Sequence, residues 1–326
     1  MQEMTMIQAI NNALRNALES DPGVLIFGED VGHNGGVFRA TDGLQQQFGE
    51  ERVFDTPLAE SGIVGTAIGM AVNGLKPIAE IQFMGFIYSA FEQIISHAAR
   101  IRTRSQGSYT VPMVIRAPYG AGIRAPELHS DSSEAFFVHQ PGLKVVVPSN
   151  PYDAKGLLLA AIEDPDPVLF LEPMKLYRAF KEPVPTEKYT VPLGKAKVMK
   201  EGTDISIFSW GAMLPAVRQA VQKAEQEMHI QAQIIDLRTL SPLDEETIIA
   251  SVQKTGRAVV VHEAPKTAGV GSEIIAIIND KALFHLEAPV ARIAGYDVPP
   301  PLFQLEDLYI PDADTIRAGI ERTMKY

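Results

Sequence analysis

Glu60 is the first of two ionisable residues whose position suits acid–base chemistry. It lies between a predicted strand that ends at Asp55 and a helix predicted to begin at Gly62. A carboxylate at a helix N-terminus is stabilised by the helix dipole, and a carboxyl group can also exchange a proton with a bound ligand. Two roles for Glu60 follow from the residues alone: a structural acid in the first helical turn, or a catalytic acid.

His129 is the second such residue. It lies in a segment rich in glycine and proline, residues 120–131, directly after a predicted strand. Loops at the carboxyl ends of strands are where α/β proteins bind ligands, and histidine takes up and releases protons near neutral pH. A structural alternative stays open, because Asp131 and Glu134 have the spacing of a capping box for the next helix.

Other candidate motifs are weaker. Residues 120–125 have the G-x-G-x-x-A pattern of dinucleotide-binding loops, but Pro126 stands where the helix should begin, and residues 269–271 are a second partial match. No G-x-S-x-G or H-E-x-x-H sequence supports a hydrolase or a zinc peptidase. Without cysteine the chain has no disulfide, no Cys-ligated metal and no thiol nucleophile. Nicotinamide binding is left as a minor alternative.

The composition is that of a globular protein with two domains. The 326 residues are 46% hydrophobic and 21% charged, which suffices for two cores at roughly 100–200 residues per domain. The formal net charge of −11 and the lack of a Lys/Arg-rich run argue against a nucleic-acid or anionic-membrane surface. No stretch reaches the roughly 20 apolar residues of a membrane span, and the N-terminus carries an acid but no apolar stretch. We therefore expect a soluble, cytoplasmic protein without a signal peptide.

Short apolar strands alternate with helices in the first part of the chain, which predicts a mostly parallel sheet with helices on both faces. Thr5 and Gln8 have the spacing of a capping box, so we expect the chain to open with a helix. The predicted strands are residues 24–28, 52–55, 77–83, 111–116, 144–147 and 168–171, and the predicted helices are 62–73, 86–104 and 153–163.

Residues 180–200 contain three prolines among charges and predict a linker. A smaller βαβαβ unit follows it. Its predicted strands are residues 204–208, 232–237, 258–262 and 290–294, and its predicted helices are 214–227, 243–254, 272–278 and 314–324. We place the domain boundary after residue 187, which gives domains of residues 1–187 and 188–326.

Longer strings, found in order along the whole chain, are more specific. The first is Phe-Asp-Thr-Pro-Leu-Ala-Glu-Ser-Gly-Ile at residues 54–63, which contains Glu60. The others are residues 28–32, 35–38, 129–130, 141–146, 151–157, 236–239 and 254–257. With these motifs the chain resembles the beta subunits of the thiamine-diphosphate-dependent 2-oxo acid dehydrogenases. The resemblance implies a transketolase-like pyrimidine-binding domain followed by a transketolase C-terminal-like domain.

The resemblance also implies a cofactor shared with a second chain. In this family the alpha subunit carries a Gly-Asp-Gly motif followed by asparagine, which holds the diphosphate through Mg²⁺. This chain has one Asp-Gly pair, Asp42-Gly43, preceded by Thr41, and Asn73 lies at a predicted helix end. We therefore assign Mg²⁺ to an alpha subunit in an α2β2 heterotetramer. The further implied partners are the subunit-binding and lipoyl domains of the acyltransferase core.

The family's site residues map onto matching positions of this sequence. Glu60 is implied to meet N1′ of the aminopyrimidine ring, and His129 to transfer protons and position substrate near C2. Leu58, Gln82 and Phe86 occupy pyrimidine-pocket positions, with Phe86 against the ring. A structural K⁺ is implied as well, held largely by backbone carbonyls at Met113, Ala161, Ile162, Asp164 and Asp166.

The expected activity is oxidative decarboxylation of pyruvate with reductive acetylation of a lipoyl group, since residues 126–131 resemble those of bacterial pyruvate enzymes. Gln82 and residues 73–77 also resemble branched-chain enzymes, so a branched-chain 2-oxo acid is the first alternative and acetoin the second. A different class of protein, a non-catalytic scaffold or electron-transfer subunit, is disfavoured because Glu60 and His129 are both retained.

Overall fold

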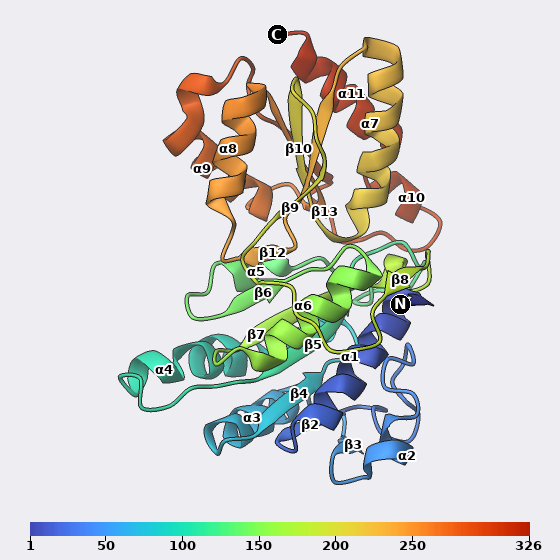
Figure 1. Cartoon of the computed structure of the whole chain (residues 1–326), viewed down its shortest axis with the longest axis vertical. Helices are drawn as coiled ribbons and strands as arrows, with labels where there is room; N and C mark the ends of the chain where they lie inside the picture. Colours follow the sequence, from blue (N-terminus) through green and yellow to red (C-terminus); the bar gives the residue numbers. More distant parts are fainter.

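Two sheets, one above the other in Figure 1, organise the chain. The computed structural model describes residues 1–326. The first sheet has the strand order β12-β6-β7-β5-β4-β2-β3 and is parallel except for β12. Its strands are β2 (Val24–Gly28), β3 (Val53–Asp55), β4 (Lys76–Glu80), β5 (Val114–Tyr119), β6 (Lys144–Val146), β7 (Val168–Pro173) and β12 (Thr239–Ser241).

The alternation of side chains along β2 shows why helices cover both faces of this sheet. Val24 and Ile26 belong to one core, and Leu25 and Phe27 belong to the other, as the two-residue period of a strand requires. The first core contains α1 (Met6–Ser20) and α6 (Pro151–Glu163), and the second contains α3 (Glu60–Val72). The capping box of Thr5 and Gln8 is present at the start of α1, as predicted.

The second sheet has the order β14-β13-β10-β11-β9 and is parallel except for β9. Its strands are β9 (Lys197–Lys200), β10 (Ile205–Ser209), β11 (Ala232–Asp236), β13 (Ala258–Pro265) and β14 (Ala291–Gly295). Figure 1 shows α8 (Glu245–Thr255) and α9 (Val270–Ala282) on one face, and α7 (Leu214–Met228) and α11 (Ala313–Met324) on the other. The predicted α/β organisation with two sheets is confirmed.

The predicted linker is partly wrong. β8 (Glu182–Val184) pairs antiparallel with β1 (Gln2–Met4), and β9 forms the edge of the second sheet. Proline is tolerated in β8 because a two-stranded sheet leaves one side of each strand unpaired. β12 was also not predicted: this strand from the second half of the chain extends the first sheet beside β6. Other short helices are α2 (Leu44–Phe48), α5 (Glu134–Val138) and α10 (Glu306–Tyr309), and 3₁₀ turns lie at Met174–Leu176, Gly211–Met213 and Leu283–His285.

The helix predicted over residues 86–104 is not continuous. A 3₁₀ helix spans Met84–Ala90, a π turn spans Gln93–His97, a second 3₁₀ turn spans Ala98–Arg100, and α4 covers Ile101–Arg104. Glycine is required at position 85 near the start of this segment, because a Cβ there would lie 2.0 Å from the carbonyl oxygen of Leu128. The segment is therefore pressed against the loop that carries His129. Among the helices, none combines the length and the continuous apolar character that a membrane span needs.

A buried ion cluster lies in the middle of the first sheet. Arg116 on β5 donates from Nη1 to Glu80 Oε2 on β4 at 2.5 Å, and from Nε to Glu172 Oε1 on β7 at 2.6 Å. The Tyr177 hydroxyl donates to Glu172 Oε2 at 2.6 Å. Burial raises the pKa of Glu80 in spite of the arginine beside it. This cluster links β4, β5 and β7 in the middle of the sheet. The segments that follow β4 and β5 contain Phe86 and His129.

Candidate active site

Glu60 is the first residue of α3, which follows β3. Its side chain is half-buried, and the Ser89 hydroxyl donates to its Oε2 at 3.0 Å. Glu29, which follows β2, lies close enough to interact electrostatically. Burial raises the pKa of Glu29, and the negative charges of Glu60 and Asp30 raise it further. Two carboxyl groups, Glu60 and Glu29, thus lie near each other at the ends of β3 and β2.

His129 lies against two aromatic rings. The centres of the Phe83 and Phe86 rings are 4.4 and 5.0 Å from the centre of the imidazole. Nδ1 of His129 is 2.8 Å from the carbonyl oxygen of Glu127. Because a carbonyl oxygen only accepts, Nδ1 carries the hydrogen, and in the neutral ring Nε2 is left to accept a proton.

The structure brings three of the predicted residues together. Ser89 joins Glu60 to the turn of Phe86, since its hydroxyl lies 3.3 Å from the Phe86 carbonyl oxygen as well as 3.0 Å from Glu60. Phe86 in turn packs edge to face on His129. The three residues follow β3, β4 and β5, and the order β5-β4-β2-β3 places those carboxyl ends at one edge. This is the edge where α/β sheets bind ligands.

The other two pocket candidates lie at the same edge without joining this contact chain. Leu58 is 79% exposed, two residues before α3. Gln82 follows β4, and its Nε2 donates to Asp30 Oδ2 at 3.0 Å. Leu58 is a large apolar side chain left open to solvent two residues before the half-buried Glu60. Exposed apolar side chains, where they form a contiguous patch, are typical of a surface that binds a ligand or a partner.

The structural alternatives for the loop residues are wrong. Asp131 and Glu134 form no capping box: Ser133 is the N-cap of α5, Asp131 accepts from the Tyr88 hydroxyl at 2.9 Å, and Glu134 is fully buried. The glycine pattern at residues 120–125 opens no helix, which a dinucleotide-binding loop requires. Residues 269–271 do form the start of α9, with Gly269 as its N-cap, but there the two glycines pack on the ring of His262.

The predicted K⁺ positions lie close together at the ends of β5, α6 and β7. The Met113 carbonyl accepts from the Val168 amide at 3.0 Å, and the Ala161 carbonyl accepts from the Asp164 amide at 3.3 Å. The Asp164 and Asp166 carboxylates are ion-paired with Lys144 and Arg102. Nowhere do three or more His, Asp or Glu side chains gather so as to hold a metal ion. This observation does not bear on ligation by carbonyl oxygens.

The Asp-Gly pair lacks the surroundings of a magnesium site. Thr41 donates through its hydroxyl to the Val31 carbonyl at 2.7 Å, and Asn73 donates back into α3, to Gly69, at 2.7 Å. Asp42 and Asn73 thus lie in different segments of the chain, and the Asn73 side chain is already bonded to α3.

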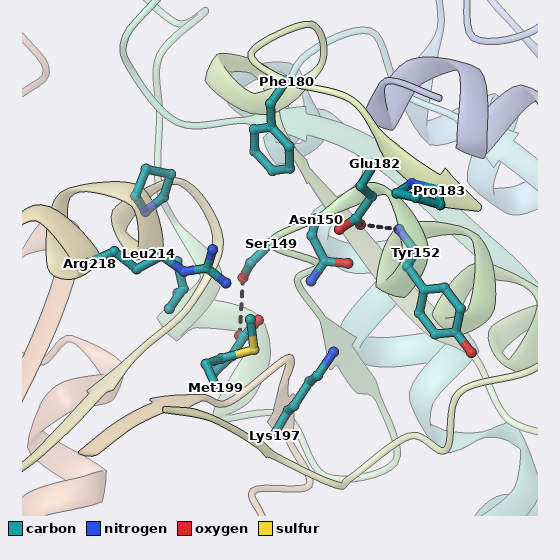
Figure 2. Close-up of a pocket in the computed structure, with 12 residues that line it drawn as sticks. Ser149, Asn150, Tyr152, Phe180, Glu182, Pro183, Lys197, Met199, Leu214 and Arg218 are labelled. Atoms are coloured by element: carbon teal, nitrogen blue, oxygen red, sulfur yellow. Dashed lines mark hydrogen bonds between the residues drawn. The ribbon is translucent and has the colours of Figure 1, made fainter. Parts of the chain in front are cut away.

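A cavity of about 420 Å³ lies elsewhere, between the two sheets (Figure 2). It is lined by residues from both halves of the chain and by the connection between them: Ser149, Asn150, Tyr152, Phe180, Glu182, Pro183, Lys197, Met199, Leu214, Pro215, Arg218 and Asp236. Ser149 donates to Asp236 within it at 3.0 Å. None of the predicted site residues lines this cavity, so it is separate from the candidate active site.

Sequence reasoning missed a buried acid between the domains. Glu134 is fully buried, and the indole Nε1 of Trp210 donates to its Oε1 at 3.3 Å across the domain interface. Burial raises the pKa of Glu134 to about 7. The two residues are 76 positions apart, and the only local pattern that includes Glu134, the capping-box spacing with Asp131, does not point to Trp210, so no sequence signal could have paired them.

Trp210 is the only tryptophan, so its fluorescence should report the titration of Glu134. We expect the emission of the purified chain to change with a midpoint near pH 7 and the change to disappear in Glu134→Gln. Because the folded pKa of this acid lies above its unfolded value, the contribution of Glu134 to the free energy of unfolding should fall as pH rises from about 4.5 to 7, by about 3 kcal/mol. Glu134→Gln should remove this contribution and leave that of Asp236 and Glu263, whose pKa burial also raises to about 7. An unchanged emission titration in this variant would contradict the assignment.

Comparison with known proteins identifies the class. The transketolase pyrimidine-binding domain matches residues 2–179, and the transketolase C-terminal domain matches residues 194–316. A split-gene transketolase, solved as an inactive beta4 tetramer, shares the fold over 99% of both chains with a TM-score of 0.81 at 22% identity. A transketolase from Pichia stipitis covers the whole chain with 46% of its own length, at a TM-score of 0.67. The chain is thus a two-domain protein of transketolase fold.

More similar relatives narrow this class. The pyruvate dehydrogenase E1 component subunit beta of Acholeplasma laidlawii is 56% identical over 99% of this chain and 98% of its own. That of Bacillus subtilis is 54% identical over the full length of both chains. The chain belongs to the family of pyruvate dehydrogenase E1 beta subunits. The boundary after residue 187, which lies between the two matched domains, stays a prediction.

Proposed function

We propose that this chain is the beta half of an enzyme that decarboxylates pyruvate oxidatively and reductively acetylates a lipoyl group. The observation that carries the proposal is the contact chain from Glu60 through Ser89 and Phe86 to His129 at one sheet edge. The names of the relatives support pyruvate as the substrate. Branched-chain 2-oxo acids and acetoin are the alternatives.

The residues fit the aminopyrimidine half of thiamine diphosphate. Phe86 and the exposed Leu58 offer apolar surface, and Glu60 offers a half-buried carboxyl group beside it. When bound, the cofactor supplies an electron sink for the carbanion that loss of CO₂ leaves. Glu60 would hold and exchange a proton at N1′, Phe86 and Leu58 would orient the ring, and His129 Nε2 would move a proton at the substrate.

The diphosphate and Mg²⁺ fit this chain poorly, since Thr41 stands where the first glycine of the motif belongs and the Asn73 amide donates back to Gly69 of α3. We propose that an alpha subunit holds both in an α2β2 heterotetramer, which docks on the subunit-binding and lipoyl domains of an acyltransferase. We also propose a structural K⁺ at the carbonyls of Met113 and Ala161, whose positions the fold brings close to those of Asp164 and Asp166.

The test is an activity panel with and without the alpha subunit. We expect the chain alone to show no decarboxylation and poor binding of thiamine diphosphate, and co-expression with alpha to restore both. Pyruvate should then give a higher kcat/KM than branched 2-oxo acids or acetoin. Full turnover by the beta chain alone would reject the shared site, and a preference for a branched substrate would reassign the enzyme within its family.

A further inference from the structure

Two carboxylates of the second domain bind the loop that carries His129. We call residues 120–133 the histidine loop. The backbone N–H of Arg124, near its middle, donates to both carboxylate oxygens of Glu306 at 3.2 and 3.1 Å. Near its end, the Ser132 hydroxyl donates to Glu263 Oε1 at 2.8 Å. Glu306 and Glu263 are 2% and 3% exposed, so both anchors are shielded from solvent.

The base of the loop is shaped to meet Glu263. The Gly120 amide donates to the Asp131 carbonyl at 3.0 Å, which closes the loop. Gly120 has a φ of +86°, and a Cβ there would lie 2.0 Å from Glu263 Oε1. Only glycine combines this backbone conformation with so close an approach. Both ends of the histidine loop therefore meet one carboxyl group of the second domain.

The middle of the loop is held in a conformation that its residues disfavour. Arg124 and Leu128 have φ values of +57° and +64°, a region in which non-glycine residues are strained. Such a conformation persists only where surrounding contacts impose it. On one side Glu306 binds the Arg124 amide, and on the other the Leu128 carbonyl lies where Gly85 leaves room for it. His129 is the next residue, against Phe83 and Phe86.

We propose that Glu306 and Glu263 are positioning residues for His129, so that the second domain sets the geometry of the active centre in the first. The inference rests on the proposed role of His129. Neither carboxylate contacts His129 itself; each acts through the backbone or hydroxyl of the loop. A contrasting contact is the ion pair from Arg124 Nη2 to Asp307 Oδ2 at 2.8 Å, whose partners are 55% and 73% exposed. Solvent-exposed ion pairs of this kind contribute little to the stability of a conformation.

The buried contact of Glu306 and the exposed contact of Asp307 both involve Arg124, so Asp307→Ala is a matched control for Glu306→Ala. The first readout is amide hydrogen exchange of the assembled alpha–beta complex without cofactor or substrate. We expect Glu306→Ala to speed exchange at residues 120–131 at least about 10-fold, with the rest of the chain unchanged. Asp307→Ala should leave it unchanged, and Glu306→Gln, which keeps one acceptor oxygen, should restore part of the protection.

The second readout is the pH profile of pyruvate turnover. Glu306→Ala should lower kcat by up to roughly 10²-fold, as for a misplaced catalytic group. It should also shift the part of the pH profile of kcat that disappears in His129→Ala.

Ser132→Ala removes the other anchor, the hydrogen bond to Glu263, and tests the same proposal if Glu306→Ala does not fold. Loop exchange and kcat no different from Asp307→Ala would overturn the proposal, and so would faster exchange with unchanged kcat. Full activity of His129→Ala would overturn the proposed function itself, whatever the loop exchange shows.

Discussion

Glu60→Gln should give a folded, assembled enzyme that has lost about 10²–10⁴-fold in activating its cofactor. Glutamine has nearly the volume of glutamate, and its amide oxygen can still accept from Ser89, as Glu60 Oε2 does at 3.0 Å. It cannot exchange a proton with N1′ of the aminopyrimidine. If Glu60 were only a partner of the α3 dipole, the same change would cost about 0.3–1 kcal/mol of stability and leave the chemistry intact.

The measurement that separates the two roles is C2–H/D exchange on thiamine diphosphate bound to the alpha–beta complex, with thermal unfolding of the same preparation. Glu127→Gln is a suitable control, because it removes an exposed negative charge from the histidine loop without touching the Glu60 contacts. We expect slow exchange with an unchanged unfolding midpoint in Glu60→Gln, and normal exchange in the control. Exchange near the wild-type rate in Glu60→Gln would show that this residue is not the activating acid.

Sequence periodicity predicted the strands well where turn residues flank them. The predicted strand 24–28 is β2 as observed. The strand predicted at 111–116 is instead Val114–Tyr119. The observed strand includes Pro118, which is buried inside β5, opposite Glu172 of β7. Packing between two neighbouring strands therefore outweighed the local preference of proline.

The candidate site was predictable to the extent that it depends on strand ends. Glu60 and His129 follow predicted strands, and parallel strands end at one edge, so their proximity follows from the fold. The roles of Leu58, Gln82 and Phe86 came from resemblance, since nothing in their residue types or spacing points to a ligand. Contacts across the domains could not be predicted, because Ser132 and Glu263 are 131 positions apart and β12 is a strand of three residues.

Arg116→Met should destabilise the chain by about 3–5 kcal/mol, because it leaves Glu80 and Glu172 buried and unpaired. Arg116 is 1% exposed and bonds Glu172 through both Nε and Nη2, at 2.6 and 2.9 Å. Methionine fills much of the same space, so the loss of stability comes from the unpaired charges more than from a cavity.

Arg317 offers a matched control, since it also lies between two glutamates, Glu227 and Glu321, but at the surface. Arg317→Met should cost no more than about 1 kcal/mol.

The pH dependence distinguishes unpaired charge from lost packing. Burial already raises the pKa of Glu80 with Arg116 present, and removing the arginine should raise it further. An acid whose folded pKa lies above its unfolded value favours the folded state at low pH, and this advantage is lost as pH rises through the folded pKa. The urea midpoint of Arg116→Met should therefore lie further below that of the wild type at pH 8 than at pH 5.5. For Arg317→Met the difference from the wild type should be the same at both pH values. An equal loss at both pH values would mean that packing of the arginine stem, rather than its charge, stabilises the centre of the first sheet.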